Sequence, residues 1–452
     1  MRVVDACINP SSVKWEGDLE KVFRDKIIFP LQTAILDDSD CRLEGEQGSL
    51  LEKFFRVIGK DSPFANTILQ EITAQEIPVQ AGQKRPWEQM SQDKAETQAT
   101  APNSESLNAQ KWRKPIINIV NQLRVLSQPE RRQGQEIRDI CWNRLVKVAV
   151  FDAGFDLKDK RLSKRVFLNG TKQPGIVGSY DFINSSDSMA DYASDKHGTE
   201  MAGWVMNIMP LAKVYVARVL YGDRSPAVGQ KEEDIYITKA IKHAVNVWEV
   251  DIISMSFAIN DHREPSEELQ KTIESVKRNV SIFAAAGNNR AGASDPVAYP
   301  ARSSDVICIH SFKSTGRVSD FSPERQKHKT RHIGCIGESL IEPINNTVTP
   351  SGTSVATAIA AGIGAVVLDF ARFCADASGV ESSDQKLSKD SHMVKRKRVM
   401  EYVLWEMTKK REDDYNLIRP QLLFNDKDGW IEKAVAGILK ILEEEKNGVL
   451  QG

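Results

Sequence analysis

Paired cysteines, long apolar runs and an excess of one charge are all missing from this sequence of 452 residues. The six cysteines are scattered without paired or metal-type spacing, which argues against a disulfide framework and favours free thiols in a reducing compartment. Lys and Arg number 61 against 62 Asp and Glu, so no overall field attracts nucleic acid or an anionic membrane. We therefore expect neither nucleic acid nor membrane as a partner.

The N-terminus lacks the apolar core of a signal peptide, and no run approaches the length of a membrane span. What is present is ordinary for a soluble globular protein, with 41% hydrophobic and 27% charged residues. On these grounds the sequence predicts a cytoplasmic protein.

Composition divides the chain into four parts. Residues 1–80 read as a helical N-terminal region, and residues 81–113 form a polar, low-complexity linker. Residues 114–144 return to helical patterning and lead into a main domain over 145–446. We expect the N-terminal region to bind a protein partner or to regulate the main domain.

From Leu145 onward, short apolar runs alternate with amphipathic helical segments. The first run, Leu145–Phe151, is continuously apolar, as is typical of a buried parallel strand. Further runs are Lys213–Leu220, Val250–Phe257, Val280–Ala286 and Val306–His310, with helical segments at Glu232–Trp248 and Pro265–Lys277. This alternation predicts an α/β fold, a mostly parallel sheet sandwiched by helices, with functional residues at the carboxyl ends of its strands.

One stretch, Ser351–Gly364, combines a Gly-Thr turn, a serine and a run of small apolar residues. A helix that is apolar on every side must be buried. Ser354 would then lie at the helix N-terminus, where unpaired N–H groups and the helix dipole favour a negative charge. Taken alone, the stretch is equally compatible with a capped core helix.

Three polar residues occur where strands end or helices begin. Asp152 follows the first apolar run, His197 opens His-Gly-Thr-Glu-Met-Ala202, and Ser354 opens the central helix. Each alone fits a structural role. The order Asp, His, Ser on a parallel α/β sheet differs from that of an α/β-hydrolase and of a chymotrypsin-like barrel, and it agrees with subtilisin.

From Leu145 to the C-terminal helices the chain resembles the subtilisin-like serine proteases (subtilases), of an intracellular type with a helical N-terminal extension. The motifs that carry the resemblance are Asp152-Ala-Gly154, His197-Gly-Thr-Glu-Met-Ala202, Ala285-Ala-Gly-Asn288 and Gly352-Thr-Ser-Val-Ala356. The resemblance implies a serine endopeptidase with Ser354 as nucleophile, His197 as base, Asp152 orienting the histidine and Asn288 completing the oxyanion hole.

The sequence departs from the family pattern at Ser256-Phe-Ala-Ile259, where relatives carry Ser-Leu-Gly-Gly along the substrate channel. We take Ser256, Phe257 and Ala258 as substrate-binding residues. Side chains in place of glycine leave less room for a peptide, so we expect small side chains at the cleavage position.

The resemblance implies a protein or peptide substrate. We expect no cofactor and no catalytic metal, although many relatives bind structural calcium. The alternative function is a catalytically degenerate subtilase that serves as a binding or signalling module; an α/β-hydrolase esterase is excluded by residue order.

Overall fold

The structure is a computed structural model. It describes residues 145–159, 162, 165–166, 175–187, 190–222, 231–259, 264–288, 297–324, 331–338, 340, 351–376, 390–408, 416–424 and 430–450. The N-terminal region, the linker and the helical lead-in that the sequence predicts lie outside these residues. The fourfold division of the chain therefore stays a prediction.

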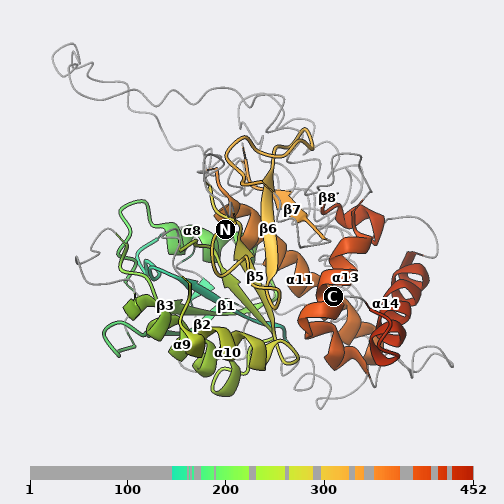
Figure 1. The fold of residues 1–452 in the computed structure, drawn as a ribbon, viewed down its shortest axis with the longest axis horizontal. Helices are drawn as coiled ribbons and strands as arrows, with labels where there is room; N and C mark the ends of the chain where they lie inside the picture. Colours follow the sequence, from blue (N-terminus) through green and yellow to red (C-terminus); the bar gives the residue numbers. More distant parts are fainter. Residues whose placement is uncertain are drawn as a thin grey trace, which may run out of the picture. The chain divides into compact units, whose positions relative to one another are not determined.

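The described residues form one sheet of eight parallel strands in the order β2-β3-β1-β4-β5-β6-β7-β8 (Figure 1). The strands are β1 Lys147–Asp152, β2 Gly175–Asp181, β3 Lys213–Arg218, β4 Ile252–Met255, β5 Ser281–Ala285, β6 Ile307–Phe312, β7 Ile333–Ile336 and β8 Asn416–Leu417. Because each parallel connection needs a crossover, helices cover both faces.

Alternation along the strands divides the core into two layers. In β1, Val148 and Val150 face one hydrophobic cluster while Ala149 and Phe151 face the other. The longer helices are α8 His197–Ile208, α9 Lys231–Asn246, α10 Glu267–Val276, α11 Thr353–Asp376, α13 Lys397–Glu406 and α14 Trp430–Lys446, with 3-10 turns η6 Ser391–Lys395 and η7 Pro420–Leu422. Helices α8, α11, α13 and α14 cover the first layer, and α9 and α10 cover the second (Figure 1).

The central helix α11 is buried, as its apolar sequence requires. Ala358, Ile359 and Ala361 are at most 1% exposed. Contrary to the expectation that no run reaches membrane-spanning length, Thr353–Cys374 is long and apolar enough to do so, with a mean hydropathy of 1.8. However, 89% of that window is buried against the sheet and its neighbouring helices, so α11 is the core helix of this fold.

All five predicted strands and the predicted helices of the main domain are present, with ends shifted by a few residues. Strands β2, β7 and β8 were not predicted. The basic run Lys395–Arg398 is not a free cationic surface, because its four side chains pair with Asp251, Glu401 and Glu445.

Candidate active site

The site lies at the point in the sheet where the order of the strands reverses. The chain places β3 on one side of β1 and β4 on the other, and such a switch point is where α/β sheets bind ligands at their carboxyl edge. Phe151 pairs with Met255, so the next residues, Asp152 and Ser256, are side by side on strands about 4.8 Å apart. Asn288 follows the end of the next strand, β5.

Asp152 and His197 form a hydrogen-bonded pair between β1 and the first residue of α8. The His197 Nδ1 lies 2.9 Å from each carboxylate oxygen of Asp152. Asp152 is 1% exposed and also accepts a 2.8 Å hydrogen bond from the Ala153 N–H. Since Nδ1 faces the carboxylate, Nε2 is the ring nitrogen left for a proton transfer.

The charge of Asp152 sets the proton affinity of this histidine. Its carboxylate raises the pKa of His197 to about 9, with smaller contributions from Asp195 and Asp191, against the lowering effect of burial. His197 therefore accepts a proton more strongly than an isolated imidazole, and the positive ring that results is stabilised by its neighbour.

The loop after β1 is approached closely by two segments, and each approach requires a glycine: Gly198 where α8 meets the loop, and Gly154 where the segment at Ala190 meets it. A Cβ on Gly198 would lie 2.2 Å from the Gly154 carbonyl oxygen, and one on Gly154 would lie 2.0 Å from the Ala190 carbonyl oxygen. Gly154 also has a φ of +123°, which side-chain-bearing residues rarely adopt. Two of the predicted motifs, Asp-Ala-Gly and His-Gly-Thr, are thus in direct backbone contact.

Ser354 stands in the first turn of α11 and is half-buried. Within the described part of the chain its backbone N–H has no hydrogen-bond partner, as expected of a residue in a first helical turn. Its carbonyl accepts a 3.1 Å hydrogen bond from the Ser256 hydroxyl, which connects α11 to the end of β4.

Asn288 is tied to the same helix start. Its Oδ1 accepts hydrogen bonds from the backbone N–H of Thr353 at 2.9 Å and from the Thr353 hydroxyl at 3.0 Å. A backbone N–H can only donate, so the amide oxygen must face Thr353 and the NH₂ group must face the opposite side. That exposed NH₂ and the N–H of Ser354, which has no partner among the described residues, are two donors that remain available to an acceptor.

The structure brings together most of the residues expected from the sequence, with one difference in detail. Ser256 contacts Ser354, and Ala258 lies beside Gly287, the residue before Asn288. The side chain of Phe257 is 8% exposed and belongs to the core layer under α9 and α10. Only the backbone of Phe257 can therefore contact a substrate.

Ser354 and His197 lie on α11 and α8, which pack against each other. Among the described residues, no hydrogen bond joins the Ser354 hydroxyl to His197. Such bonds between nucleophile and base are often long in a free enzyme and tighten when substrate binds.

No group of three or more His, Cys, Asp or Glu side chains within the described ranges is arranged to hold a metal ion.

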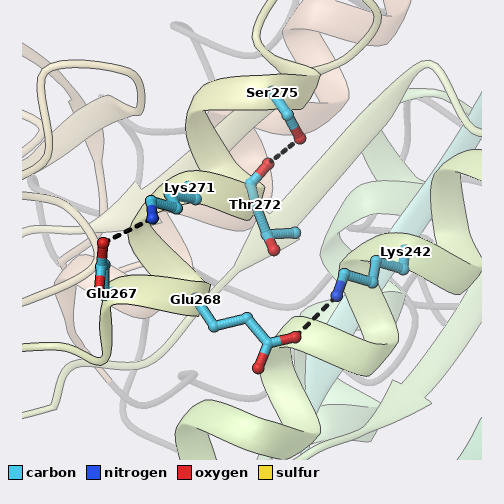
Figure 2. A pocket seen from close by; sticks show the side chains of 6 residues that line it. All are labelled: Lys242, Glu267, Glu268, Lys271, Thr272 and Ser275. Carbon is cyan, nitrogen blue, oxygen red and sulfur yellow. Dashed lines mark hydrogen bonds and ion pairs between the residues drawn. The ribbon is translucent and has the colours of Figure 1, made fainter.

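A hollow of about 400 Å³ lies between α9 and α10, and none of the residues named above lines it (Figure 2). Its lining is polar: Lys242 pairs with Glu268 at 2.8 Å and Lys271 with Glu267 at 2.5 Å. Their side chains are at least half exposed. This hollow contains neither a nucleophile beside a base nor a set of converging donors, so it is not the chemical site.

Two residues of the site were not found by sequence reasoning. Thr353 holds Asn288, and the buried carboxylate of Asp191 binds Thr199 of α8. Thr353 lies inside the predicted serine motif, which was the available signal. For Asp191 the signal was indirect: Lys196, the residue before α8, is a poor helix cap.

Comparison with known proteins identifies the family to which this sequence is similar. The model of the subtilase family, Peptidase_S8, matches residues 143–378. The major intracellular serine protease of Bacillus subtilis is 28% identical over 243 residues, covering 50% of this chain and 69% of that protein. The subtilisin-like protease het-Q2 of Podospora anserina is 27% identical over 263 residues, covering 50% and 70%.

Among solved structures, a variant of the protease domain of PatA matches with 19% identity and a TM-score of 0.46, over 68% of this chain and 97% of that one. The family model spans more than half of the 452 residues and ends beyond the candidate nucleophile. It also includes Asp152, His197 and Asn288. The chain therefore belongs to the subtilase family of serine endopeptidases.

Proposed function

We propose that this protein hydrolyses peptide bonds with an Asp152–His197–Ser354 triad. The observation that carries the proposal is the pair of 2.9 Å contacts between His197 Nδ1 and the buried Asp152 carboxylate. A buried carboxylate in that position fixes the tautomer of a histidine whose other nitrogen then faces the reacting groups.

The reaction would proceed in two steps, acylation of Ser354 and hydrolysis of the acyl-enzyme. As the Ser354 Oγ bonds to the scissile carbonyl carbon, its proton moves to His197 Nε2. His197 then gives that proton to the leaving amine, and the C–N bond breaks to leave an acyl-enzyme. Water, deprotonated by His197, releases the acid and restores Ser354.

The negative oxygen formed in each step would be held by the Asn288 NH₂ group and the Ser354 backbone N–H. The two hydrogen bonds from Thr353 support this role, because they hold the amide with its donors outward before substrate arrives. No reorganisation of the donors is then needed in the transition state.

We also propose a preference for small side chains at the cleavage position. A Cβ built on Gly287 lies 3.5 Å from the Ala298 Cβ and 3.8 Å from the Ala258 Cβ, so two methyl groups flank the backbone just before Asn288. In the family pattern the position of Ala258 is a glycine, so its methyl group narrows the space beside the reacting carbonyl.

We further propose an intracellular site of action and a regulatory or targeting role for residues 1–80. The described cysteines, Cys308, Cys335 and Cys374, are buried, and the six cysteines of the sequence have no paired spacing, which suits a reducing compartment. The similar B. subtilis protein is named an intracellular protease. Unchanged activity and partners after deletion of residues 1–110 would refute the role of the N-terminal region.

The proposed function is tested with a fluorophosphonate probe. Ser354 Oγ would bond to phosphorus as fluoride leaves, so the wild-type protein should be labelled and the Ser354→Ala variant should not. Labelling that does not depend on Ser354, or none in a correctly folded wild type, would favour the binding or signalling module.

A further inference from the structure

The residues just before the helix that carries His197 cap it only in part: the Asp195 Oδ1 accepts a 3.1 Å hydrogen bond from the His197 N–H. Lys196, the residue before α8, has a left-handed backbone with φ of 56°, and its side chain makes no capping hydrogen bond. The first-turn N–H groups of a buried helix must nevertheless find acceptors. The N–H of Thr199, the third residue of α8, therefore needs a different acceptor.

Asp191 supplies that acceptor from six residues before His197. Its Oδ2 accepts hydrogen bonds from the Thr199 N–H at 2.8 Å and from the Thr199 hydroxyl at 2.7 Å, and its Oδ1 accepts one from the Ala193 N–H at 3.2 Å. Thr199 is the third residue of α8, the position that an N-cap side chain normally reaches. Asp191 is 6% exposed and Thr199 is fully buried.

The Thr199 hydroxyl extends the connection to the segment that carries Asp152. While it donates to Asp191, it accepts a 2.8 Å hydrogen bond from the Asp156 N–H, in the loop after β1. The Tyr192 N–H donates to the Ala153 carbonyl at 3.2 Å, so the Asp191 segment also contacts this loop directly. Asp191 therefore stands between the two segments whose side chains form the 2.9 Å Asp152–His197 pair.

We propose that Asp191 is the positioning residue of the active site: through Thr199 it holds the start of α8 against the loop after β1 and so sets the contact between His197 and Asp152. It touches neither substrate nor reacting atoms. The inference rests on the proposed function, since positioning matters to the rate only if the pair transfers a proton.

Asp191 also adds a negative charge close to the pair. Burial raises the pKa of Asp191, and the nearby Asp152 raises it further, while the hydrogen bonds from Thr199 and Ala193 lower it. The other charged groups around His197 and Asp191 are Asp152, Asp195, Lys196 and Asp156. Arg218 lies opposite Asp152 on β3 and forms an ion pair with Asp181, with 2.6 Å between Nη1 and Oδ2.

Two substitutions separate the charge of Asp191 from its hydrogen bonds. Asp191→Asn keeps an acceptor for the Thr199 N–H but removes the charge, so the acid limb of kcat/KM against pH should move to lower pH. Thr199→Val keeps the charge of Asp191 but removes both hydrogen bonds of the Thr199 hydroxyl. In this variant kcat should fall about 10- to 100-fold, KM should change little, and the acid limb of kcat/KM should stay at the same pH. Thr199→Ser should restore most of the rate.

Asp251→Asn is the matched control. Asp251 is also a buried carboxylate, 4% exposed, and holds Arg372 through two hydrogen bonds at the amino end of β4. Its replacement should lower thermal stability without moving the pH profile. A merely structural Asp191 would behave in the same way.

The experiment uses the full chain, with fluorophosphonate labelling and peptide hydrolysis measured side by side. Unchanged kcat and pH profile in folded Asp191→Asn and Thr199→Val variants, while the wild type is labelled at Ser354, would overturn the positioning role alone. Absence of Ser354-dependent labelling in the wild type would instead overturn the proposed function.

Discussion

The site consists of two halves that different kinds of hydrogen bond hold in place. In the first, Asp152 and His197, with Asp191 behind them, rely on buried carboxylates. In the second, Asn288 and Ser354 rely on neutral donors and acceptors, through Thr353 and Ser256. After their proposed roles, we call these the proton-transfer half and the oxyanion half.

This difference predicts that the two halves respond differently to pH. Charges that raise the pKa of His197 make the first half sensitive to pH. The second half contains no titrating group among these contacts, and in the proposed mechanism it would stabilise charge only when the transition state creates it. Damage to the first half should therefore change the pH profile, and damage to the second should lower the rate at every pH.

The largest effect should come from Asp152→Asn. An amide cannot hold the histidine tautomer as a carboxylate does, so kcat should fall by about 10⁴-fold. Without the carboxylate, the pKa of His197 should also fall from about 9 toward its ordinary 6.5. Catalysis requires neutral His197, so kcat/KM of the wild type should rise as the pH passes through about 9. In the variant, this rise in kcat/KM should occur at a lower pH. Peptide hydrolysis across this pH range measures both effects; a limb that stays in place would contradict the assigned cause of the shift.

A smaller loss, independent of pH, should follow from Asn288→Ala. Removing such an asparagine in this family costs about 10²–10³ in kcat, and we expect KM to change little because the hydrogen bond forms in the transition state. Steady-state kinetics at several pH values would measure this loss. An equal rise in KM would show instead that Asn288 binds the ground-state substrate.

The smallest effect should be a change of preference in Ala258→Gly. Removing the methyl group beside Gly287 should improve kcat/KM for larger side chains at the cleavage position by about 10-fold, since one methyl(ene) group in a pocket discriminates at that level. Competition between peptides that differ only at that position measures it. Phe257→Leu is the control, because the buried Phe257 side chain should affect stability and not preference. A wild type that already cleaves after bulky aromatic residues at high rate would contradict the proposed selectivity.

Much of the fold could be predicted because a strand buried on both faces is continuously apolar, as β1 is. Strand β2 escaped prediction because Gly175, Gly178 and Ser179 interrupt its apolar pattern, and it lies at the edge of the sheet, half-exposed along much of its length. Strand β7 has four residues, including Gly334, too few to establish a period.

The chemical residues could be predicted because each stands in a short local motif, whereas their supports depend on the tertiary fold. Asp191 acts through Thr199, and the intervening residues mark that contact only indirectly, through Lys196, a poor helix cap. The orientation of Phe257 was within reach of the sequence: the period of two along Ile253, Met255 and Phe257 places all three side chains in the same core layer.

The most direct test is a double-mutant cycle across the two halves, because no hydrogen bond joins His197 to Ser354 in the free protein. Peptide hydrolysis would be measured for His197→Ala, Ser354→Ala and the double variant. If the two residues transfer one proton in one step, either substitution removes the whole contribution, and the double variant should be no slower than the singles. Losses that multiply in the double variant would contradict a shared mechanism.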